Sequence, residues 1–152
     1  MFYNDFFHSS PTEDMEEYLY RLWDDDALNM EDANFDTLSG AKKIFSLVWN
    51  FDTYVCGGLN NYLDIMGEDK AYECVDSLQI IGAIEASDIL LKALKAIAAH
   101  GLGRLWDILE IEDVRESLFA LDDKLLDCRS DVVKCLFNFL NSRRDELFAK
   151  IS

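Results

Sequence analysis

An all-α fold is predicted by three features of this 152-residue chain. Apolar residues recur at steps of three and four, which places them on one face of a helix. Proline occurs once, so long segments can remain helical. Half of the residues are apolar, which is enough for a core. We expect a single-domain antiparallel helical array of about six to eight helices around a central apolar helix.

The chain begins with an aromatic N-terminal segment, residues 1–9, which we expect to dock on the helical domain, residues 10–152, or on a second subunit. The first helix has a strong start signal. Ser10 can cap it, Pro11 suits its first position, and Glu13 completes a capping box. Its apolar stripe consists of Met15, Tyr18, Leu19, Leu22 and Trp23.

A very apolar second helix is predicted over residues 36–52, and two adjacent glycines interrupt the pattern after it. Glycine costs helix stability unless the backbone needs a positive φ or a close approach. We therefore expect a tight corner at Gly57 and Gly58, with the positive φ at Gly57. Leu59 and Tyr62 then return to the core.

The middle of the chain is predicted to hold an amphipathic turn ending at residue 66 and a short helix over residues 70–78. Gly82 separates these from a helix over residues 83–99, which we expect to be the central one because only a narrow stripe of it is polar. That stripe consists of Glu85, Asp88, Lys92 and Lys95. Its acids precede its bases, as the helix dipole favours.

The C-terminal third is predicted to contain two further helices. Ile111, Val114, Leu118, Leu121 and Leu125 continue the helical steps of the first. Ser130 is expected to cap the second, which ends among cations.

The charge of the chain is strongly negative and unevenly distributed. Thirty acids against 14 bases give a net charge of −16. Residues 1–40 hold eleven acids and only Arg21 as a base, a net charge of −10. Such a field repels nucleic acid and anionic membranes and attracts basic surfaces. The alternative is that the acids only keep the protein dispersed in water.

Catalytic and metal chemistry find little support in the sequence, so we expect neither an enzyme nor a cofactor. Nucleophilic catalysis needs a base beside the nucleophile, and His8 and His100 are better explained as contacts at helix ends. The Cys and His residues lack zinc spacing, and an EF-hand loop beginning at Asp24 fails at Asn29 and Phe35. A carboxylate–metal enzyme would require acids that converge in a cleft.

The four cysteines, none in a Cys-x-x-Cys pair, are expected to be reduced and to pack as small apolar residues. The start of the chain has no basic, apolar leader and no apolar run approaches 18 residues. We therefore expect a cytoplasmic protein that does not span a membrane.

One use of the N-terminal acids is physically coherent. A row of carboxylates can meet the cations that a DNA-binding surface presents to phosphates. Asp24 to Asp26 follow a helix C-terminus, where the dipole disfavours anions, and that cost suggests a use. The candidate partner-binding residues are Asp24, Asp25, Asp26, Glu31, Asp32 and Asp36, with Glu13, Glu16 and Glu17 behind them.

The run from Val55 to Leu63, Val-Cys-Gly-Gly-Leu-Asn-Asn-Tyr-Leu, resembles the Val-Asn-Gly-Gly-Phe-x-Gln-Tyr/Phe-Phe signature of a bacterial family of unknown function. This is the DMP-nineteen-like family, whose characterised member is a DNA mimic. Trp-Asn-Phe-Asp before the glycines, Ile-Ile-Gly-Ala at Gly82 and the C-terminal helices also resemble it, over residues 38–148. Cys56, Leu59 and Asn61 depart from the signature, so the chain is a distant member.

The resemblance implies an acidic, all-helical and often dimeric protein that covers the DNA-binding surface of a helix-turn-helix regulator. A DNA mimic that blocks a basic DNA-binding protein is therefore the leading hypothesis, with a possible homodimer. The alternative is an immunity protein or antitoxin that plugs a basic toxin such as a nuclease. The glycine motif itself supports the fold more than the function.

Overall fold

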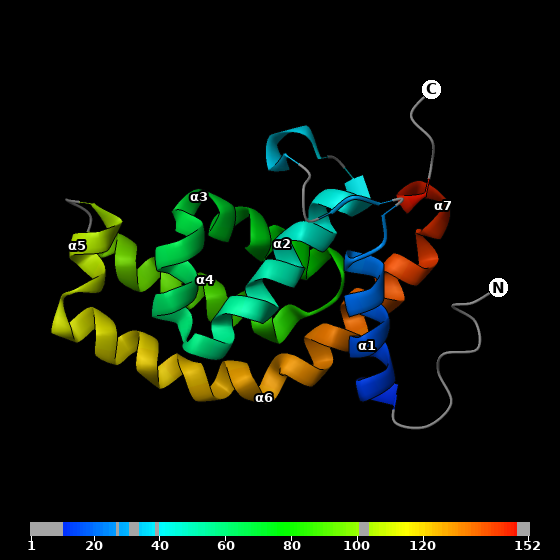
Figure 1. The fold of residues 1–152 in the computed structure, drawn as a ribbon. Coiled ribbons are helices and arrows are strands. Elements are labelled where there is room, and N and C mark those ends of the chain that lie inside the picture. The colour runs from blue at the N-terminus through cyan, green and yellow to red at the C-terminus, as the bar shows by residue number, and fades with distance from the viewer. Residues whose placement is uncertain (1–10, 27, 31–33, 39, 101–103, 149–152) are drawn as a thin grey trace. The chain divides into compact units, whose positions relative to one another are not determined.

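The computed structural model describes residues 11–26, 28–30, 34–38, 40–100 and 104–148. Within them every regular element is helical, which confirms the all-α prediction (Figure 1). The α-helices are α1 (Pro11–Trp23), α2 (Gly40–Tyr54), α3 (Leu59–Ile80), α4 (Ile84–Ala98), α5 (Leu105–Leu109), α6 (Glu112–Ser142) and α7 (Arg144–Leu147). Two 3₁₀ turns, η1 (Phe35–Thr37) and η2 (Val55–Gly57), precede α2 and α3. The predicted aromatic segment and the Ser10 cap lie outside the described residues.

The chain divides into two compact units, residues 1–46 with 133–152 and residues 47–132. Both boundaries fall inside helices, because residue 46 lies in α2 and residue 133 in α6. A single domain remains a prediction of the sequence.

The first unit contains α1, which begins at Pro11, the residue predicted for its first position. Its predicted apolar stripe faces inward, with Tyr18, Leu19 and Leu22 buried. The ring of Tyr18 meets Phe137 edge to face, with centroids 5.2 Å apart. Such a pair contributes about 0.5–1.5 kcal/mol beyond the area that it buries. The stripe therefore anchors α1 by packing rather than by helix propensity.

The start of α2 differs from the prediction. The helix begins at Gly40, which has φ +58°, and not at Asp36. Asp36 lies instead in η1, where its backbone N–H donates to Asn34 Oδ1 at 3.1 Å. A short polar side chain that accepts from the backbone two residues on favours a turn over a helix.

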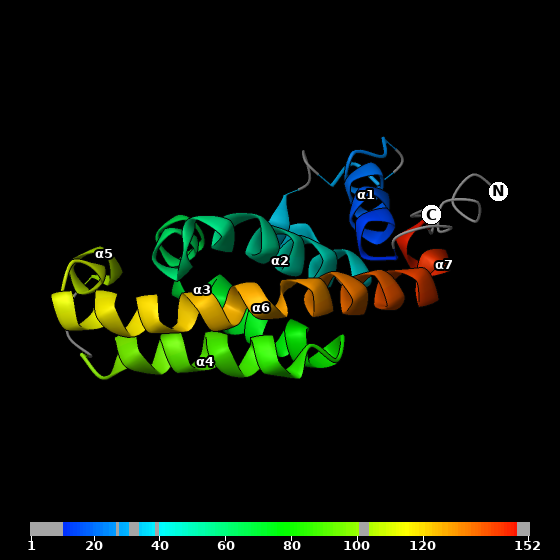
Figure 2. The ribbon, with the colours of Figure 1, turned by 90° about the horizontal axis from the view of Figure 1, so that it is seen from below.

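The second unit contains α3, which is two helical segments joined at Gly67 (φ +81°, ψ 167°). These segments correspond to the amphipathic turn and the short helix that the sequence predicted separately. α3 packs against α4, whose bounds match the prediction to within one residue at each end (Figure 2). The polar stripe of α4 is exposed as expected, and the buried Ser87 donates through Oγ to Val75 O at 2.9 Å.

The C-terminal helices also differ from the prediction. α6 runs without a break for 31 residues, so Ser130 lies inside a helix and does not cap one. The buried residues on either side of it, Cys128 and Val132, keep the helical steps of three and four. A lone serine therefore did not mark a boundary. The five-residue helix α5 was not predicted, because it is too short to show a period.

Candidate protein-interaction surface

The predicted corner is formed by η2 and the residue that follows it. Gly58 has φ +97° and ψ 160°, whereas Gly57 lies in η2 without a positive φ, so the expectation for Gly57 is wrong by one residue. The Gly58 N–H donates to Val55 O at 2.8 Å, and the Tyr62 N–H donates to Gly58 O at 3.1 Å. The chain thus leaves α2 at Tyr54 and enters α3 at Leu59, with only four residues between them.

The first backbone N–H of α3 is capped from a distant part of the second unit. Leu59 N–H donates to Oδ1 of Asp122 on α6 at 2.9 Å. Burial raises the pKa of Asp122 above 3.8; the Leu59 hydrogen bond opposes this and Asp123 adds to it. Leu59 and Tyr62 are fully buried, and the Tyr62 ring meets Phe51 edge to face at 5.1 Å. The corner is therefore held by a cap and a core contact.

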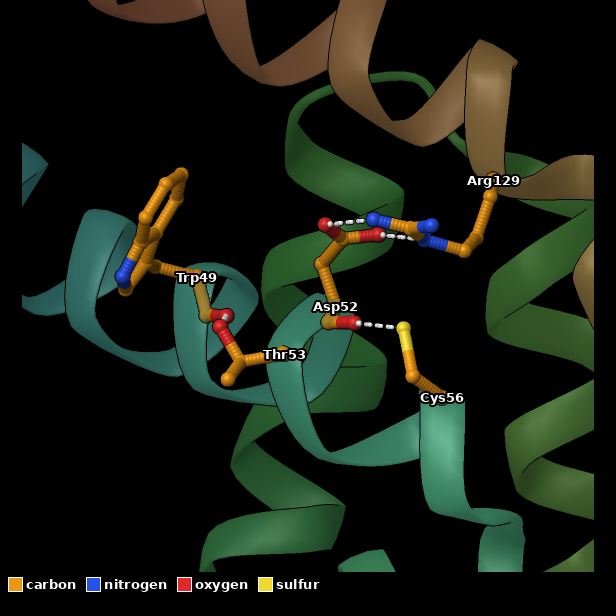
Figure 3. A network of polar contacts seen from close by, with 5 residues as sticks. All are labelled: Trp49, Asp52, Thr53, Cys56 and Arg129. Carbon is orange, nitrogen blue, oxygen red and sulfur yellow. Dashed lines mark hydrogen bonds and ion pairs between the residues drawn. The ribbon is translucent and has the colours of Figure 1, made fainter. Parts of the chain in front are cut away.

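A buried ion pair lies one turn before the corner (Figure 3). Both carboxylate oxygens of Asp52 accept from Arg129, from Nε at 2.7 Å and from Nη2 at 2.9 Å. The Asp52 side chain is 9% exposed and that of Arg129 is 32% exposed. A bidentate pair whose carboxylate is shielded from water fixes the two helices by geometry as well as by charge.

Burial favours the neutral forms of two thiols and one phenol in the second unit. Burial raises the pKa of Cys74 to about 12 and raises that of Tyr62 above its ordinary value of 10.0. Burial likewise raises the pKa of Cys128 to about 11. Cys74 Sγ instead contacts Leu47 O at 3.6 Å. All four cysteines lie among the described residues, and none of them forms a disulfide bond. Cys56, which is exposed, contacts Asp52 O at 3.5 Å (Figure 3).

In the part of the chain that the structure describes, no group of three or more His, Cys, Asp or Glu side chains converges to hold a metal ion. His100 lies exposed in the turn after α4, and His8 is outside the described residues.

The three consecutive aspartates that the sequence singled out occupy the turn after α1. Asp24 and Asp26 are exposed, and Asp25 is partly exposed. The turn is ordered by its own backbone, since Leu28 N–H and Asn29 N–H both donate to Asp25 O, at 3.1 and 3.0 Å. Leu28 itself is buried. An anchored turn therefore presents these carboxylates to water.

The other candidate acids are spread along the first unit. Asp36 is exposed in η1, Glu16 is partly exposed on α1, and Glu13 lies in the first turn of α1. Glu17 is exposed and pairs with Arg21 at 3.0 Å, one helical turn away. Exposed pairs of this kind contribute only about 0.3–0.5 kcal/mol. Glu31 and Asp32 lie outside the described residues.

A second acidic surface, which the sequence reasoning missed, lies where α6 begins. A hollow of about 440 Å³ is lined there by Phe119 together with Glu110, Glu112, Arg115 and Glu116. A second hollow of about 370 Å³ shares Arg115 and Phe119 and extends to the glycine corner. The sequence feature that could have indicated this surface is Phe119, an aromatic residue among the polar positions of α6.

A comparison with models of known protein families finds a match over most of the chain. A family model described as DMP19-like protein matches residues 36–143. No curated protein is significantly similar to the chain. The same holds for solved structures. In the described residues, every helix is too short or too polar to cross a membrane.

Proposed function

This chain belongs to the DMP19-like protein family, and we propose that it is an acidic protein-interaction module that binds a basic, DNA-binding protein and blocks its DNA site. It acts by binding alone, with no catalytic step and no cofactor. A helix-turn-helix regulator is the kind of partner that fits, because its recognition surface is built from cations placed to meet phosphates.

The observation that carries the proposal is the concentration of charge in the first 40 residues, a net charge of −10 out of −16. Asp24, Asp26 and Asp36 present their carboxylates to water from a turn and a 3₁₀ element. Each carboxylate can accept the N–H groups of a partner's lysine or arginine in place of a DNA phosphate. Long-range attraction between the opposite charges also raises the rate of encounter.

The test begins with capture of basic partners from a lysate at low salt, followed by measurement of their affinity for defined variants. The first variant changes Asp24, Asp25 and Asp26 together to Asn. A control variant changes three exposed aspartates of the second unit, Asp76, Asp88 and Asp127, to Asn and so removes the same charge. We expect the first variant to bind at least about tenfold more weakly and the control to change far less.

Salt dependence gives an independent readout of the same proposal. Binding through charge weakens as salt shortens the range of the field. Affinity that does not depend on salt, or that is equal in the two triple variants, contradicts the proposal.

A basic toxin, such as a nuclease, is the second partner class that the charge favours, because its active site also binds phosphates. The two classes separate in one experiment. An antitoxin suppresses the catalytic activity of its partner, whereas a DNA mimic displaces DNA from a partner that has no such activity.

A further inference from the structure

Phe119 is the most conspicuous apolar group on the surface of the second unit. Its side chain is 74% exposed, the largest value among the large hydrophobic residues that the structure describes. Exposing a ring to water is unfavourable, and a ring that lines two hollows is typical of a binding surface. Phe119 lies on α6, about two turns after the helix begins at Glu112.

Two hollows share Arg115 and Phe119 in their linings. The first, of about 440 Å³, is bounded by Glu110, Glu112 and Glu116. The second, of about 370 Å³, is bounded by the Gly57–Gly58 corner, Asp64 and Asp122. We define the Phe119 groove as these two hollows together.

The charges around the Phe119 groove restrict what can occupy it. Five carboxylates, those of Glu110, Glu112, Glu116, Asp64 and Asp122, line it against the single guanidinium of Arg115. An anionic ligand is repelled by this frame, and so is a second copy of a chain with a net charge of −16. An uncharged apolar segment would strip water from the carboxylates and offer them nothing in return. A cationic segment fits on both counts.

Arginine is the side chain that this combination suits best. Its planar guanidinium can lie against an aromatic face and donate to carboxylates at its edge in the same pose, whereas lysine offers a compact charge. Asp122 accepts Leu59 N–H through Oδ1, and its Oδ2 is a further acceptor beside Gly58. A side chain at Gly58 would place its Cβ 3.2 Å from that Oδ2 and would cover it.

We infer that the Phe119 groove binds an arginine-bearing segment of a basic protein partner, with the guanidinium on the Phe119 ring and among the surrounding carboxylates. The inference takes from the proposed function only that the partner is basic. It adds a docking site in the second unit to the N-terminal acids that the sequence identified.

The probe for the test is an acetylated and amidated hexa-arginine peptide, with hexa-lysine as its matched cation. We expect hexa-arginine to shift the backbone NMR signals of Gly58, Asn61, Arg115 and Phe119 more than those around Asp24. Phe119→Ser should weaken hexa-arginine binding about three- to tenfold and remove its advantage over hexa-lysine, because the ring contact is lost. Asp64→Asn should also weaken binding.

The matched control is Leu126→Ser, which removes another exposed apolar side chain from the same helix (48% exposed). It should leave peptide binding unchanged. Both variants should melt like the parent chain, since neither side chain is buried. Equal binding by the parent chain and Phe119→Ser, or peptide shifts confined to the N-terminal acids, would overturn the inference. So would a dimer of the chain that dissociates on Phe119→Ser.

Failure of the groove and failure of the proposed function are distinguishable. If a captured regulator is displaced from DNA by the parent chain and equally well by Phe119→Ser, the groove is wrong and the proposed function stands. If hexa-arginine binds at the groove as described but no captured partner is displaced from DNA, the groove stands and DNA blocking is wrong.

Discussion

At the scale of single residues, the second unit depends on polar groups that hold distant helices together. Asp52 and Arg129 are 77 positions apart in sequence, and Leu59 and Asp122 are 63 apart. The sequence places Asp52 at the end of a very apolar predicted helix, and its burial and its partner come from the structure. Only the fold identifies Arg129, because helix periodicity does not determine which helices become neighbours.

Changing Asp52 to Ala should destabilise the protein by about 3 kcal/mol, since removing one member of a buried pair leaves the other charge uncompensated. Arg129 is about one-third exposed, so water can recover part of that loss. Replacing both residues with Leu should cost much less than Asp52→Ala alone. Chemical denaturation of the single and double variants measures this, and purely additive effects would contradict the pairing.

Changing Gly58 to Ala should cost about 1–2 kcal/mol, because its φ of +97° is strained for any residue with a Cβ. Gly57→Ala is the matched control. Its Cβ would meet Asn61 Nδ2 at 2.8 Å, and moving that amide costs the hydrogen bond from Nδ2 to Tyr54 O, about 0.5–1.5 kcal/mol. Thermal melts that place the larger loss at Gly57 would show that the corner is misassigned.

Asp122 should make stability depend on pH with a known sign. Its pKa is raised by burial, so the folded chain holds this proton more tightly than the unfolded chain does. The contribution is fully present below pH 3.8 and is lost as the pH rises through the raised pKa.

Asp122→Asn keeps an oxygen for Leu59 N–H and has no charge to bury. The free energy of unfolding of Asp122→Asn should therefore increase relative to that of the parent chain as the pH rises. Asp122→Ala lacks the cap and should be about 1 kcal/mol less stable than Asp122→Asn at every pH. Chemical denaturation at about pH 3 and pH 7 measures the free energy of unfolding of both variants. If Asp122→Asn differs from the parent chain by the same amount at the two pH values, the pKa of Asp122 is not raised.

At the scale of helices, the apolar periodicity predicted which segments are helical better than it predicted where each helix begins and ends. α4 was placed to within one residue, and the two segments of α3 were recognised although the break at Gly67 was not. The boundary at Ser130 was wrong because serine is compatible with a cap and with an exposed helical position. The buried face of α6 continues through Cys128, Val132 and Val133, so the helix does not end at Ser130.

A proline substitution at Asp131 distinguishes one continuous α6 from two helices with a boundary at Ser130. At the first position of a new helix it would be tolerated, whereas inside α6 it removes a hydrogen bond and clashes with the preceding turn. Asp131→Pro should therefore cost about 3 kcal/mol or more, and Asp131→Ala should cost little. Far-UV circular dichroism and denaturation measure the loss, and a parent-like melt for the proline variant would indicate two helices.

At the scale of the whole molecule, a net charge of −16 acts on stability as well as on binding. Like charges repel within the folded chain, and salt weakens that repulsion. The melting temperature should therefore rise as sodium chloride increases from about 10 to 500 mM. A melting temperature that falls with salt would mean that attractive pairs outweigh the repulsion.

The family, the all-α class and the uneven charge could be predicted from the sequence, because they depend on composition and local pattern. The Phe119 groove could not be predicted, because it brings together the glycine corner and the start of α6, which are more than fifty residues apart in the sequence. One exposed aromatic residue in a polar stripe acquires meaning only when the fold brings hollows and carboxylates beside it.

In the proposed function, the protein and DNA compete for one surface of a basic partner. The direct measurement is the release of a fluorescent DNA duplex from the captured partner as the protein is added. Mutually exclusive binding predicts complete release, with an apparent affinity that weakens in proportion to the DNA concentration. A stable ternary complex, in which the protein binds while the DNA anisotropy stays high, would contradict the claim.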